Sequence, residues 1–420
     1  MIVDVIIIGA GLAGLSCAAT LKKESPLLRI LIVEARSRIG GRVYSSTLLT
    51  PHQSVDLGAE FIQGEHSLVQ QLGIQTDPLH LRTISGKGGY YYLGYEAKLL
   101  PSTSSDKDII HLHDTIRNIK SESIPHTKVL DYLLKQGVPT RVLGLVHDSS
   151  ITTLCNEVQK DFDPKIYRVS SYISLLAKLR IGIEIWTEWP VKEIEWKTNC
   201  VRLISEKNEI MVARTIVFTP SVAVVKSGII TFSPPLPYRK LKSYKLTRME
   251  PCIKIALVFH TRFVPDDFQG IICADCPVPE FWDSSSSSTN EFVLIAYATS
   301  SSAVLLSRLS MLELQHTILR QLDRMFRKDC FDTPATNSYC NMMVQDWTKD
   351  KYIGGGFSSP VFSLGEKERN DMASPMDHTI YFAGEATSAT RYMTVQGAME
   401  SGSRAAYEII RDHTRNKSKL

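Results

Sequence analysis

The sequence has little imbalance of charge and no long apolar run. Its 48 basic and 44 acidic side chains leave a net charge of +4 over 420 residues. A charge this small provides no electrostatic drive toward nucleic acid or an anionic membrane surface. No apolar stretch of the sequence approaches the roughly 20 residues that a membrane-spanning helix requires. We therefore predict no nucleic-acid partner and no membrane span.

Cysteine is also scarce, with eight in the whole chain. Cys273 and Cys276 are separated by two residues, but no second pair of this kind and no nearby histidine completes a zinc site. We expect reduced thiols and no bound metal. Hydrophobic residues make up 43% and charged residues 22% of the sequence, which is typical of a globular protein with two or three domains.

What the chain does have is a nucleotide-binding pattern at its start. Residues 3–8 form an apolar run broken by one aspartate, as in a strand buried on both faces. Gly9, Gly11 and Gly14 follow in a G-x-G-x-x-G pattern, and a second apolar run ends on Glu34. A strand, a glycine turn, a helix and an acid at this spacing are the fingerprint of a dinucleotide site.

Each position of the fingerprint has a physical role. Gly9 permits a tight turn, Gly11 lets a pyrophosphate approach the backbone, and Gly14 lets the helix pack closely on the strand. The helix then directs free N–H groups and a partial positive charge at the phosphates, and we count Ala13 in its first turn among the cofactor contacts. Glu34 is placed to accept hydrogen bonds from ribose hydroxyls.

The residues that follow distinguish FAD from NAD. Residues 34–42 read E-A-R-S-R-I-G-G-R, which resembles the E-A-x-x-R-x-G-G-R segment of flavin-dependent amine oxidases. The resemblance implies that Ala35 and Gly41 lie close to FAD and that Arg42 neutralises phosphate charge. Arg36 and Arg38 are expected to be solvated charges of the loop.

Further segments extend this resemblance from residue 3 to about residue 410. They include I-I-T-F-S-P-P-L-P at 229–237, W-T-K-D-K-Y-I-G-G-G-F at 347–357, and T-V-Q-G-A at 394–398. The last of these is similar to polyamine oxidases and flavin histone demethylases. Within the family, the chain looks most like a peroxisomal-type polyamine oxidase.

The fold that this resemblance implies is α/β, with a Rossmann-like (GR2-type) FAD-binding domain and an inserted α+β substrate-binding domain. The predicted FAD-binding domain is discontinuous, and the substrate-binding domain fills its gaps. We expect a hairpin at 90–98, helices at about 107–121, 126–136 and 140–160, and an amphipathic helix at 307–328. The predicted boundaries are 1–75, 185–245 and 350–410 for the FAD-binding domain, 76–184 and 246–349 for the substrate-binding domain, and 411–420 for a flexible tail.

Several cofactor contacts follow from the resemblance. Gly58 and Ala59 are small residues that would approach the flavin ring, and the backbone of Val191 would meet the adenine. Glu385 would hydrogen-bond the ribityl chain or the pyrophosphate region. The N–H of Val395, next to Thr394 at a helix start, would face the flavin O2 atom. Glycine rather than cysteine stands at position 356, so the resemblance implies non-covalent FAD.

The candidate catalytic residues are Lys254, Phe357, Glu60 and Gln63. Lys254 interrupts an apolar strand and matches the family lysine that holds a water against flavin N5; the alternative is a solvent-facing lysine on an edge strand. Phe357 would form a wall of the amine site, or is plain core. Glu60 and Gln63 would face the substrate, although many polyamine oxidases have histidine where Gln63 stands; for Glu60, a salt bridge at a strand end is the alternative.

The resemblance implies an FAD-dependent oxidase that removes a hydride from a carbon next to an amine nitrogen. The expected substrates are spermine, spermidine or N-acetylated forms, with O₂ as acceptor and an imine, then an aldehyde and an amine, and H₂O₂ as products. The alternative is a flavin oxidase of another amine or an amino acid, although we place no arginine to clamp a carboxylate. A histone demethylase and a non-enzymatic FAD-binding protein are two further hypotheses.

The sequence ends in Ser418-Lys419-Leu420. S-K-L at a C-terminus is an address read by the peroxisomal import receptor rather than a membrane anchor. We therefore expect delivery to peroxisomes if the source is eukaryotic, and a cytoplasmic protein otherwise.

Overall fold

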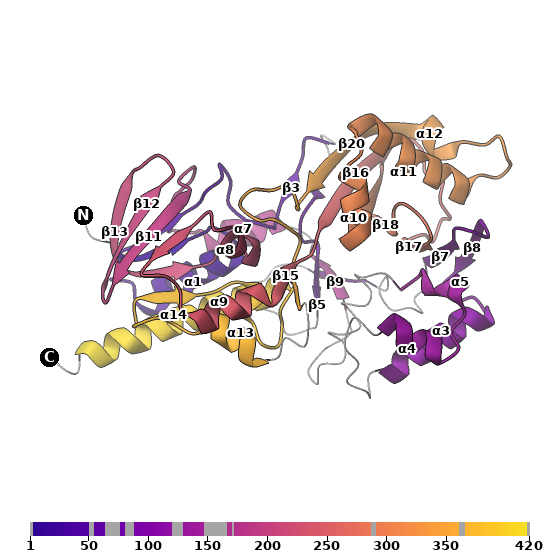
Figure 1. The fold of residues 1–420 in the computed structure, drawn as a ribbon. Helices are drawn as coiled ribbons and strands as arrows, with labels where there is room; N and C mark the ends of the chain where they lie inside the picture. Colours follow the sequence, from indigo (N-terminus) through magenta and orange to yellow (C-terminus); the bar gives the residue numbers. More distant parts are fainter. Residues whose placement is uncertain are drawn as a thin grey trace.

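The computed structural model describes residues 3–49, 54–63, 76–79, 88–119, 129–146, 166–169, 172–286, 291–360 and 366–417. The described chain forms two lobes (Figure 1). One lobe contains both ends of the chain and most of the early and late strands and helices. The other is built mainly from residues 88–146 and 252–346.

The first lobe is centred on an eight-stranded mixed sheet. The parallel strands β2, β1 and β13 lie side by side in its middle, because their β-branched residues suit burial on both faces. Val5, Ile6 and Ile7 of β1 are completely buried. The order is β10 (Glu184–Trp186), β2 (Ile30–Val33), β1 (Val3–Ile8), β13 (Ile210–Phe218), β12 (Cys200–Ser205), β11 (Val191–Lys197) and β14 (Thr231–Ser233), with β22 (Ile380–Phe382) paired to β13.

Two helices pack together on one face of this sheet. They are α1 (Leu12–Glu24), which follows β1, and the long C-terminal helix α14 (Val395–Lys417). A Cβ atom on Gly402 would lie 2.1 Å from the carbonyl oxygen of Ala13, so glycine allows the two helix backbones to touch. The shared core cluster also includes α7 (Tyr172–Leu179), which belongs to the range 76–184 that the sequence assigns to the substrate-binding domain.

The other face of the first sheet carries a separate core cluster. Ile6, Val33 and Phe218 lie in this cluster, on the central strands. Three short helices complete the lobe: α8 (Val222–Ser227), α9 (Tyr238–Lys245) and α13 (Glu366–Ala373). The proline-rich linker 229–237 contributes the edge strand β14 before α9 begins.

The second lobe is built on a seven-stranded sheet. Its strand β16 lies between β20 and β19, and every residue of β16 is buried. The predicted hairpin at 90–98 is confirmed as β7 and β8. The order is β20 (Tyr339–Asp346), β16 (Cys252–Phe259), β19 (Phe292–Thr299), β18 (Glu280–Asp283), β17 (Gly270–Ala274), β7 (Gly89–Leu93) and β8 (Lys98–Pro101).

Helices cover one face of this sheet. They are α10 (Ser300–Leu306), α11 (Met311–Phe326) and α12 (Pro334–Ser338). The predicted amphipathic helix is α11, and it begins with a capping box in which Ser310 and Glu313 bond each other's backbone N–H groups. Its apolar stripe, which includes Leu314, Ile318 and Leu322, packs on the sheet.

A small helical cluster follows β8. It consists of α3 (Lys107–Ile119), α4 (Val129–Lys135) and α5 (Thr140–Leu143). The helix predicted at 140–160 begins at Thr140 as expected, but the prediction is wrong for residues 144–146, because α5 ends at Leu143 and Gly144 follows against β17. A Cβ atom on Gly144 would lie 2.9 Å from that of Ala274. Residues 147–165 lie outside the described residues.

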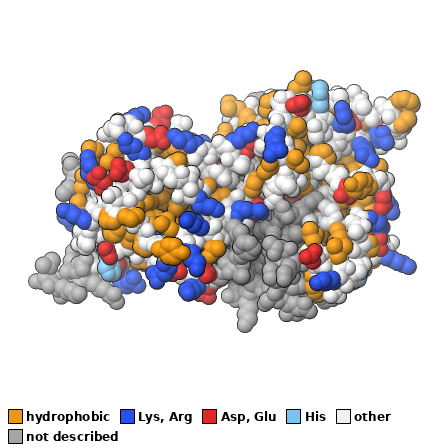
Figure 2. All heavy atoms as spheres, viewed as in Figure 1, with side chains coloured by type: hydrophobic (Ala, Val, Ile, Leu, Met, Phe, Trp, Pro, Cys, Tyr) orange, Lys and Arg blue, Asp and Glu red, His pale blue; other side chains and the backbone are white. Residues whose placement is uncertain are grey.

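Short strands connect the lobes around the site. They pair as β3 (Ser45–Ser46) with β4 (Val55–Asp56), as β5 (Phe61–Gln63) and β6 (Thr76–Leu79) with β9 (Ile166–Val169), and as β15 (Thr247–Met249) with β21 (Ser358–Pro360). Acidic and basic side chains are interspersed on the face seen in Figure 2. Among the described residues, none of the helices is both long and apolar enough to cross a membrane.

Candidate active site

A cavity opens where the central strands of the first sheet end. The β1–α1 turn, the loop after β2, the segment after β13 and the start of α14 all line it. Carboxyl ends of parallel strands are where ligands bind in open α/β sheets. Among the residues predicted from the sequence, the cavity is lined by Gly9, Gly11, Ala13, Glu34, Gly41, Arg42, Ala59, Phe357, Glu385, Thr394 and Val395.

Two glycine segments face each other across one end of this cavity. The φ of Gly9 is +104° and that of Gly41 is +58°, in the region that glycine adopts without strain. A Cβ atom on Gly41 would lie 3.3 Å from the Cα of Gly11, and Gly11 pairs with Gly40 in a short β-bridge. Backbone without side chains therefore lines a narrow cradle beside the N-terminus of α1, which suits a pyrophosphate.

Gly14 serves the packing role rather than lining the cavity. A Cβ atom there would lie 2.0 Å from the carbonyl oxygen of Gly9, so any other residue would push α1 off the strand. This is the close contact of helix and strand that the fingerprint predicts.

Glu34 stands at the end of β2 and is 7% exposed. Its Oε2 accepts a hydrogen bond from the N–H of Ala10 at 2.8 Å, and its Oε1 accepts one from the N–H of Arg36 at 3.0 Å. Each carboxylate oxygen keeps a further lone pair. The fixed carboxylate inside the cavity therefore fits the ribose-binding role predicted for it.

The expectation that Arg36 and Arg38 are solvated is wrong. Arg36 forms an ion pair with Asp350, and only 13% of its side chain is exposed. Arg38 lies over the ring of Tyr44, 4.3 Å from its centroid, and donates to three backbone carbonyls of its own loop. Burial, with the charge of Arg36, lowers the pKa of Arg38 to about 10. Both side chains fasten the loop that carries Gly41.

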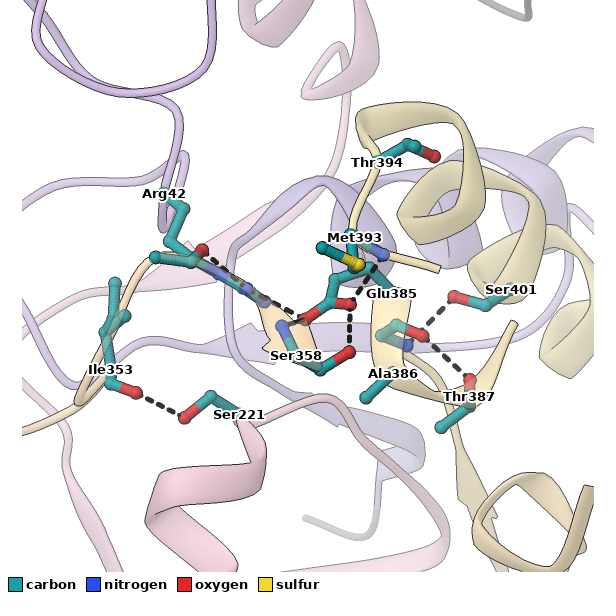
Figure 3. A network of polar contacts seen from close by, with 12 residues as sticks. Arg42, Ser221, Ile353, Ser358, Glu385, Ala386, Thr387, Met393, Thr394 and Ser401 are labelled. Atoms are coloured by element: carbon teal, nitrogen blue, oxygen red, sulfur yellow. Dashed lines mark hydrogen bonds and ion pairs between the residues drawn. The ribbon is translucent and has the colours of Figure 1, made fainter. Parts of the chain in front are cut away.

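Glu385 is the centre of a buried polar network, shown in Figure 3. Its Oε1 accepts hydrogen bonds from Arg42 Nη1 at 2.9 Å and from the N–H of Ser358 at 3.1 Å. Its Oε2 accepts from Ser358 Oγ at 2.6 Å and from the N–H of Met393 at 2.9 Å. Burial alone would raise the pKa of Glu385, but the charge of Arg42 and these hydrogen bonds hold it below the ordinary value.

This network joins three distant parts of the chain at the cavity. Arg42 also donates to the carbonyl of Gly356 at 3.0 Å, so its guanidinium is fixed at the wall by two partners. The sequence predicts Arg42 and Glu385, but no motif identifies Ser358 or Met393 as their partners. Those two contribute chiefly backbone N–H groups, whose position depends on the fold.

Lys254 lies at the centre of a second buried network, on β16. Its side chain is 4% exposed, and its Nζ lies 2.8 Å from Oε2 of Glu60 and 3.1 Å from the carbonyl oxygen of Gly58. Glu60 also accepts from Trp282 Nε1 at 3.0 Å and from Ser284 Oγ at 3.3 Å. Strand β16 is internal to its sheet, so Lys254 is not on a solvent-facing edge, and the carboxylate of Glu60 is engaged with the lysine.

Four other residues predicted from the sequence are not among the described residues that line the cavity: Gly58, Ala35, Val191 and Gln63. Gly58 packs on the loop that ends in Arg42: a Cβ atom there would lie 2.1 Å from the Arg42 carbonyl oxygen. Ala35 and Val191 belong to two segments that hydrogen-bond each other, since Trp189 N–H donates to the carbonyl of Glu34 at 2.9 Å. Gln63 ends β5, and its side chain lies outside the described part of the structure.

The flavin-facing residues predicted at the start of α14 lie in the cavity wall. Thr394 Oγ1 accepts a hydrogen bond from the N–H of Gly397 at 3.0 Å, as a helix cap does. Val395 is the first residue of α14, so no carbonyl within the helix is available to its N–H. Phe357 is partly buried and also lines the cavity.

Gly356 lies beside a buried cysteine. A Cβ atom on Gly356 would lie 2.6 Å from the Cβ and 3.0 Å from the Sγ of Cys252, so this chain has no room for a side chain there. Burial raises the pKa of Cys252 to about 12, which keeps its thiol protonated and poorly nucleophilic.

Comparison with known proteins agrees with this geometry. The family model for flavin-containing amine oxidoreductases matches residues 101–410, and the model for an NAD(P)-binding Rossmann-like domain matches residues 7–72. Solved structures with the same fold include wild-type putrescine oxidase bound to putrescine and cyclohexylamine oxidase from Brevibacterium oxydans IH-35A. Each has a TM-score of 0.78 and 20% sequence identity, and each match covers 98% of this chain. The match covers 99% of the putrescine oxidase chain and 100% of the cyclohexylamine oxidase chain.

Curated relatives include histone demethylases and polyamine oxidases. Lysine-specific histone demethylase 1 homolog 2 of Oryza sativa subsp. japonica is 26% identical over 97% of this chain, which spans only 57% of that protein. Polyamine oxidase 4 of the same plant and polyamine oxidase 2 of Arabidopsis thaliana are each 24% identical over 96% of this chain, which spans 88% and 87% of them. Because the first family model matches most of the chain, the protein belongs to the flavin-containing amine oxidoreductases, and FAD is its cofactor.

Proposed function

We propose that this protein is a polyamine oxidase acting on spermine, spermidine or their N-acetylated forms. The observation that carries the proposal is the similarity to the polyamine oxidases of rice and Arabidopsis, each of which is 24% identical over 96% of this chain. The T-V-Q-G-A segment at 394–398, which is similar to polyamine oxidases and flavin histone demethylases, agrees with it.

The cavity supports a site for FAD without a covalent bond. The glycine cradle would hold the pyrophosphate, Glu34 the ribose, and the N-terminus of α14 the polar edge of the ring. When bound, FAD supplies the oxidant that accepts a hydride from the substrate and passes electrons to O₂. Cys252, protonated and buried, is a poor nucleophile for attachment. Acid precipitation should release yellow flavin; flavin that stays in the pellet would contradict this part of the proposal.

The protein's own residues prepare the amine. An amine must be neutral to lose hydride, because a protonated nitrogen has no lone pair to stabilise the cation that forms. Phe357 and Ala59 give the cavity apolar walls, and an apolar surrounding favours the neutral amine. Lys254 supplies a fixed positive charge, held by Glu60 and the Gly58 carbonyl at the edge of the Ala59 segment.

Glu60 is not proposed as the partner of a distal ammonium group of the substrate. Its Oε2 already faces the ammonium of Lys254 and the indole N–H of Trp282, and its Oε1 faces Ser284. A second cation would have to compete with a buried pair, which is costly to break. Specificity for polyamines therefore depends on other residues of the cavity mouth.

A substrate panel tests the function. We would measure H₂O₂ release with spermine, N-acetylspermine, spermidine, putrescine, cyclohexylamine, benzylamine and amino acids. The proposal expects the highest kcat/KM among the first three. A higher kcat/KM for benzylamine or putrescine would favour an oxidase of another amine, and a higher value for an amino acid would favour that alternative.

An assay with a methylated histone peptide distinguishes a histone demethylase from a polyamine oxidase. Demethylase relatives of Oryza sativa subsp. japonica and Arabidopsis thaliana are 26% and 25% identical over 97% of this chain, so demethylation is the second candidate function. Release of formaldehyde from a monomethyl-lysine peptide at a rate above that of spermine oxidation would overturn our proposal. Loss of flavin colour on anaerobic addition of any amine would in turn exclude a purely structural role for FAD.

We also propose delivery to peroxisomes through Ser418-Lys419-Leu420, which lie outside the described residues. The helix α14 ends at Lys417, immediately before them. An oxidase that makes H₂O₂ would share a compartment with catalase there. A fluorescent protein fused at the N-terminus should give punctate signal, and removal of the three residues should make it diffuse. Diffuse signal from the intact fusion would exclude the address.

A further inference from the structure

Cys273 and Cys276 form a thiol pair remote from the FAD cavity. Cys273 is the fourth residue of β17 and is completely buried, while Cys276 is partly buried in the turn that leads to β18. Both side chains pack in the same core cluster under α11, where the sulfur of Cys273 lies 3.6 Å from that of Met325. The two thiols therefore share one side of the turn.

The turn that joins the two cysteines is tightly defined. The N–H of Cys273 donates to the carbonyl of Pro279 at 2.7 Å, which closes the base of the turn. Gln321 of α11 bonds both the N–H and the carbonyl of Val278, at 2.9 and 2.8 Å. Asp275, at the tip, adopts a positive φ of 53°. The spacing of the cysteines in space is thus fixed by the backbone and by α11.

Two neighbours hold the turn from the outside. A Cβ atom on Gly94 would lie 3.0 Å from Sγ of Cys276 and 2.6 Å from the carbonyl oxygen of Ala274. Arg324 of α11 donates to the carbonyl of Gly94 at 3.0 Å, so its guanidinium lies beside the same turn. Asp275 and Pro277 are exposed on either side of Cys276, and a small oxidant can approach from there.

The surroundings shift the pKa values of the two thiols in opposite directions. A hydrogen bond with the Cys273 thiol, supported by the positive charge of Arg324, holds the pKa of Cys276 below its ordinary value. Burial, and the neighbouring Cys276, raise the pKa of Cys273 well above it. A more acidic, accessible thiol beside a protonated one is the arrangement in which the first reacts and the second resolves.

We propose that a hydroperoxide oxidises Cys273 and Cys276 to an intramolecular disulfide. Cys276 is the thiol that attacks the peroxide, and Cys273 then attacks the oxidised Cys276. The assignment rests on their spacing, their common core face and the packing of the turn between β7 and α11. The oxidant is a hydroperoxide, and the proposed oxidase reaction would supply it as H₂O₂.

The chemistry balances without any further reagent. The Cys276 thiolate attacks one oxygen of H₂O₂; the O–O bond breaks, hydroxide leaves with the electron pair and becomes water, and Cys276 becomes a sulfenic acid. Cys273 then attacks that sulfur, the S–O bond breaks, and the departing oxygen leaves as a second water with the Cys273 proton. The two sulfurs lose two electrons, which the peroxide gains.

The test treats the FAD-loaded protein, without amine, with graded H₂O₂ before blocking free thiols with a maleimide. Peptide mass spectrometry should find the peptide with both cysteines unlabelled and two hydrogens lighter, and dithiothreitol should restore its labelling. Cys330 and Cys340 are exposed and serve as internal comparators. We expect Cys276 to lose its label at least fivefold faster than either, although it is less exposed.

Two variants separate the roles of the sulfurs. Cys276→Ser should abolish oxidation of the remaining thiol, whereas Cys273→Ser should leave a Cys276 sulfenic acid that dimedone traps. Cys330→Ser is the matched control and should leave the disulfide unchanged. Because Cys273 is buried, the wild-type peptide map and Cys276→Ser decide the matter even if Cys273→Ser fails to fold.

Loss of label at Cys330 and Cys340 while Cys276 stays labelled would overturn the proposal, as would a disulfide between either cysteine and a third. Repeating the experiment with spermine and O₂ in place of added peroxide, with and without catalase, tests the source of oxidant. A disulfide with added H₂O₂ but none during spermine exposure would support the dithiol and count against spermine oxidation.

Discussion

Lys254 and Glu60 form a buried ion pair, so a change in either residue affects the other. The sequence identifies Lys254, because a lysine inside an apolar strand is conspicuous. It leaves open whether Glu60 faces substrate or forms a salt bridge, since the partner lies 194 residues away. The register of β16 between β19 and β20 fixes Lys254 inside its sheet, and the segment between β4 and β5 brings Glu60 to it. Both charges share one buried site, and their effects must be separated by mutation.

We predict that Lys254→Met retains FAD but slows turnover at least tenfold, equivalent to about 1.4 kcal/mol of barrier. The substitution removes the fixed positive charge and leaves the cofactor cradle intact. Stopped-flow measurement of flavin reduction and of reoxidation by O₂ would show which half-reaction is slowed. Unchanged rates in both would contradict a catalytic role for Lys254.

The same substitution should also destabilise the fold, because it leaves Glu60 buried without its cation. Removing one member of a buried ion pair costs about 3–5 kcal/mol. Glu60→Gln added to Lys254→Met removes the orphaned charge and keeps an acceptor for Trp282. We therefore expect the double variant to be more stable than Lys254→Met in urea unfolding. A double variant that loses the sum of both single effects would show that the residues are independent.

Glu385 should make stability depend on acid pH. Its pKa is lower in the folded protein than in the unfolded chain, chiefly because the Arg42 charge and its hydrogen bonds outweigh burial. Its contribution is therefore present above the unfolded pKa of about 4.3 and is lost as pH falls through the folded value. Thermal unfolding between about pH 3 and 6 should show a smaller fall in Tm for Glu385→Gln than for the wild type.

Glu195→Gln is the matched control for this pH series. Glu195 pairs with Arg202 at the surface, where the two side chains are 40% and 41% exposed. Such pairs contribute little because solvent screens them. The control should reproduce the wild-type slope of Tm against pH, and a slope altered as much as in Glu385→Gln would mean that the buried network is not its source.

Helices and strands were predictable where a sequence pattern identifies them. They were less predictable where a tertiary contact accompanies the end of a helix. The periodic apolar stripe identifies α11, and the glycine fingerprint identifies β1 and α1 together. Helix α5, in contrast, ends after four residues at Gly144, where its chain meets β17. The sequence after Gly144 still reads as helical, and it does not reveal that Gly144 lies close against Ala274 of β17. The prediction that Arg36 and Arg38 are solvated failed for two reasons: Arg36 pairs with the distant Asp350, and Arg38 folds back onto carbonyls of its own loop.

The contact of α1 with α14 gives an element-scale prediction. Gly402→Ala would place a Cβ atom 2.1 Å from the carbonyl oxygen of Ala13 and 3.0 Å from the N of Cys17. Backbone atoms cannot rotate away as side chains do, so the helices must separate. We expect a loss of about 1–3 kcal/mol, the usual cost of overpacking, measured by urea unfolding with an unchanged m-value.

Gly228→Ala is the control for Gly402→Ala. Gly228 follows α8 with φ +70°, and a Cβ atom there would meet nothing within 4 Å. Its cost is the conformational strain alone, about 1 kcal/mol. Gly402 has no such strain, because it lies within α14, where alanine is intrinsically favoured over glycine. A gain in stability on Gly402→Ala would therefore contradict the close contact between α1 and α14.

At the scale of the whole molecule, the FAD cavity is assembled from segments between Gly9 and Ala398. The order of the motifs predicts that these segments meet, because together they complete one cofactor site. It does not predict the packing of α7 on α1, since residues 76–184 carry no cofactor motif. The division into domains that we drew from the sequence stays a prediction, with α7 sharing the core of the first sheet.

Because the cavity joins both ends of the chain, FAD should stabilise the protein as a whole. A ligand that binds only the folded state adds about 2.7 kcal/mol at 100 times its Kd. We expect Tm of the apoprotein to rise steadily with FAD concentration and to be nearly unaffected by NAD. An equal rise with NAD would contradict the assignment of the cofactor.

The variant Gly11→Ala distinguishes the stabilisation by bound FAD from the stability of the apoprotein fold. Gly11 has φ −76°, which alanine adopts readily, and its Cβ atom would approach nothing closer than the Cα of Gly41 at 4.0 Å. The apoprotein should therefore keep its Tm. The methyl group would nevertheless occupy the cradle where a pyrophosphate must reach the backbone, so the rise in Tm with FAD should be lost or need at least tenfold more FAD. An apoprotein that unfolds early would instead show that Gly11 is required by the fold, and a normal FAD response would place the pyrophosphate elsewhere in the cavity.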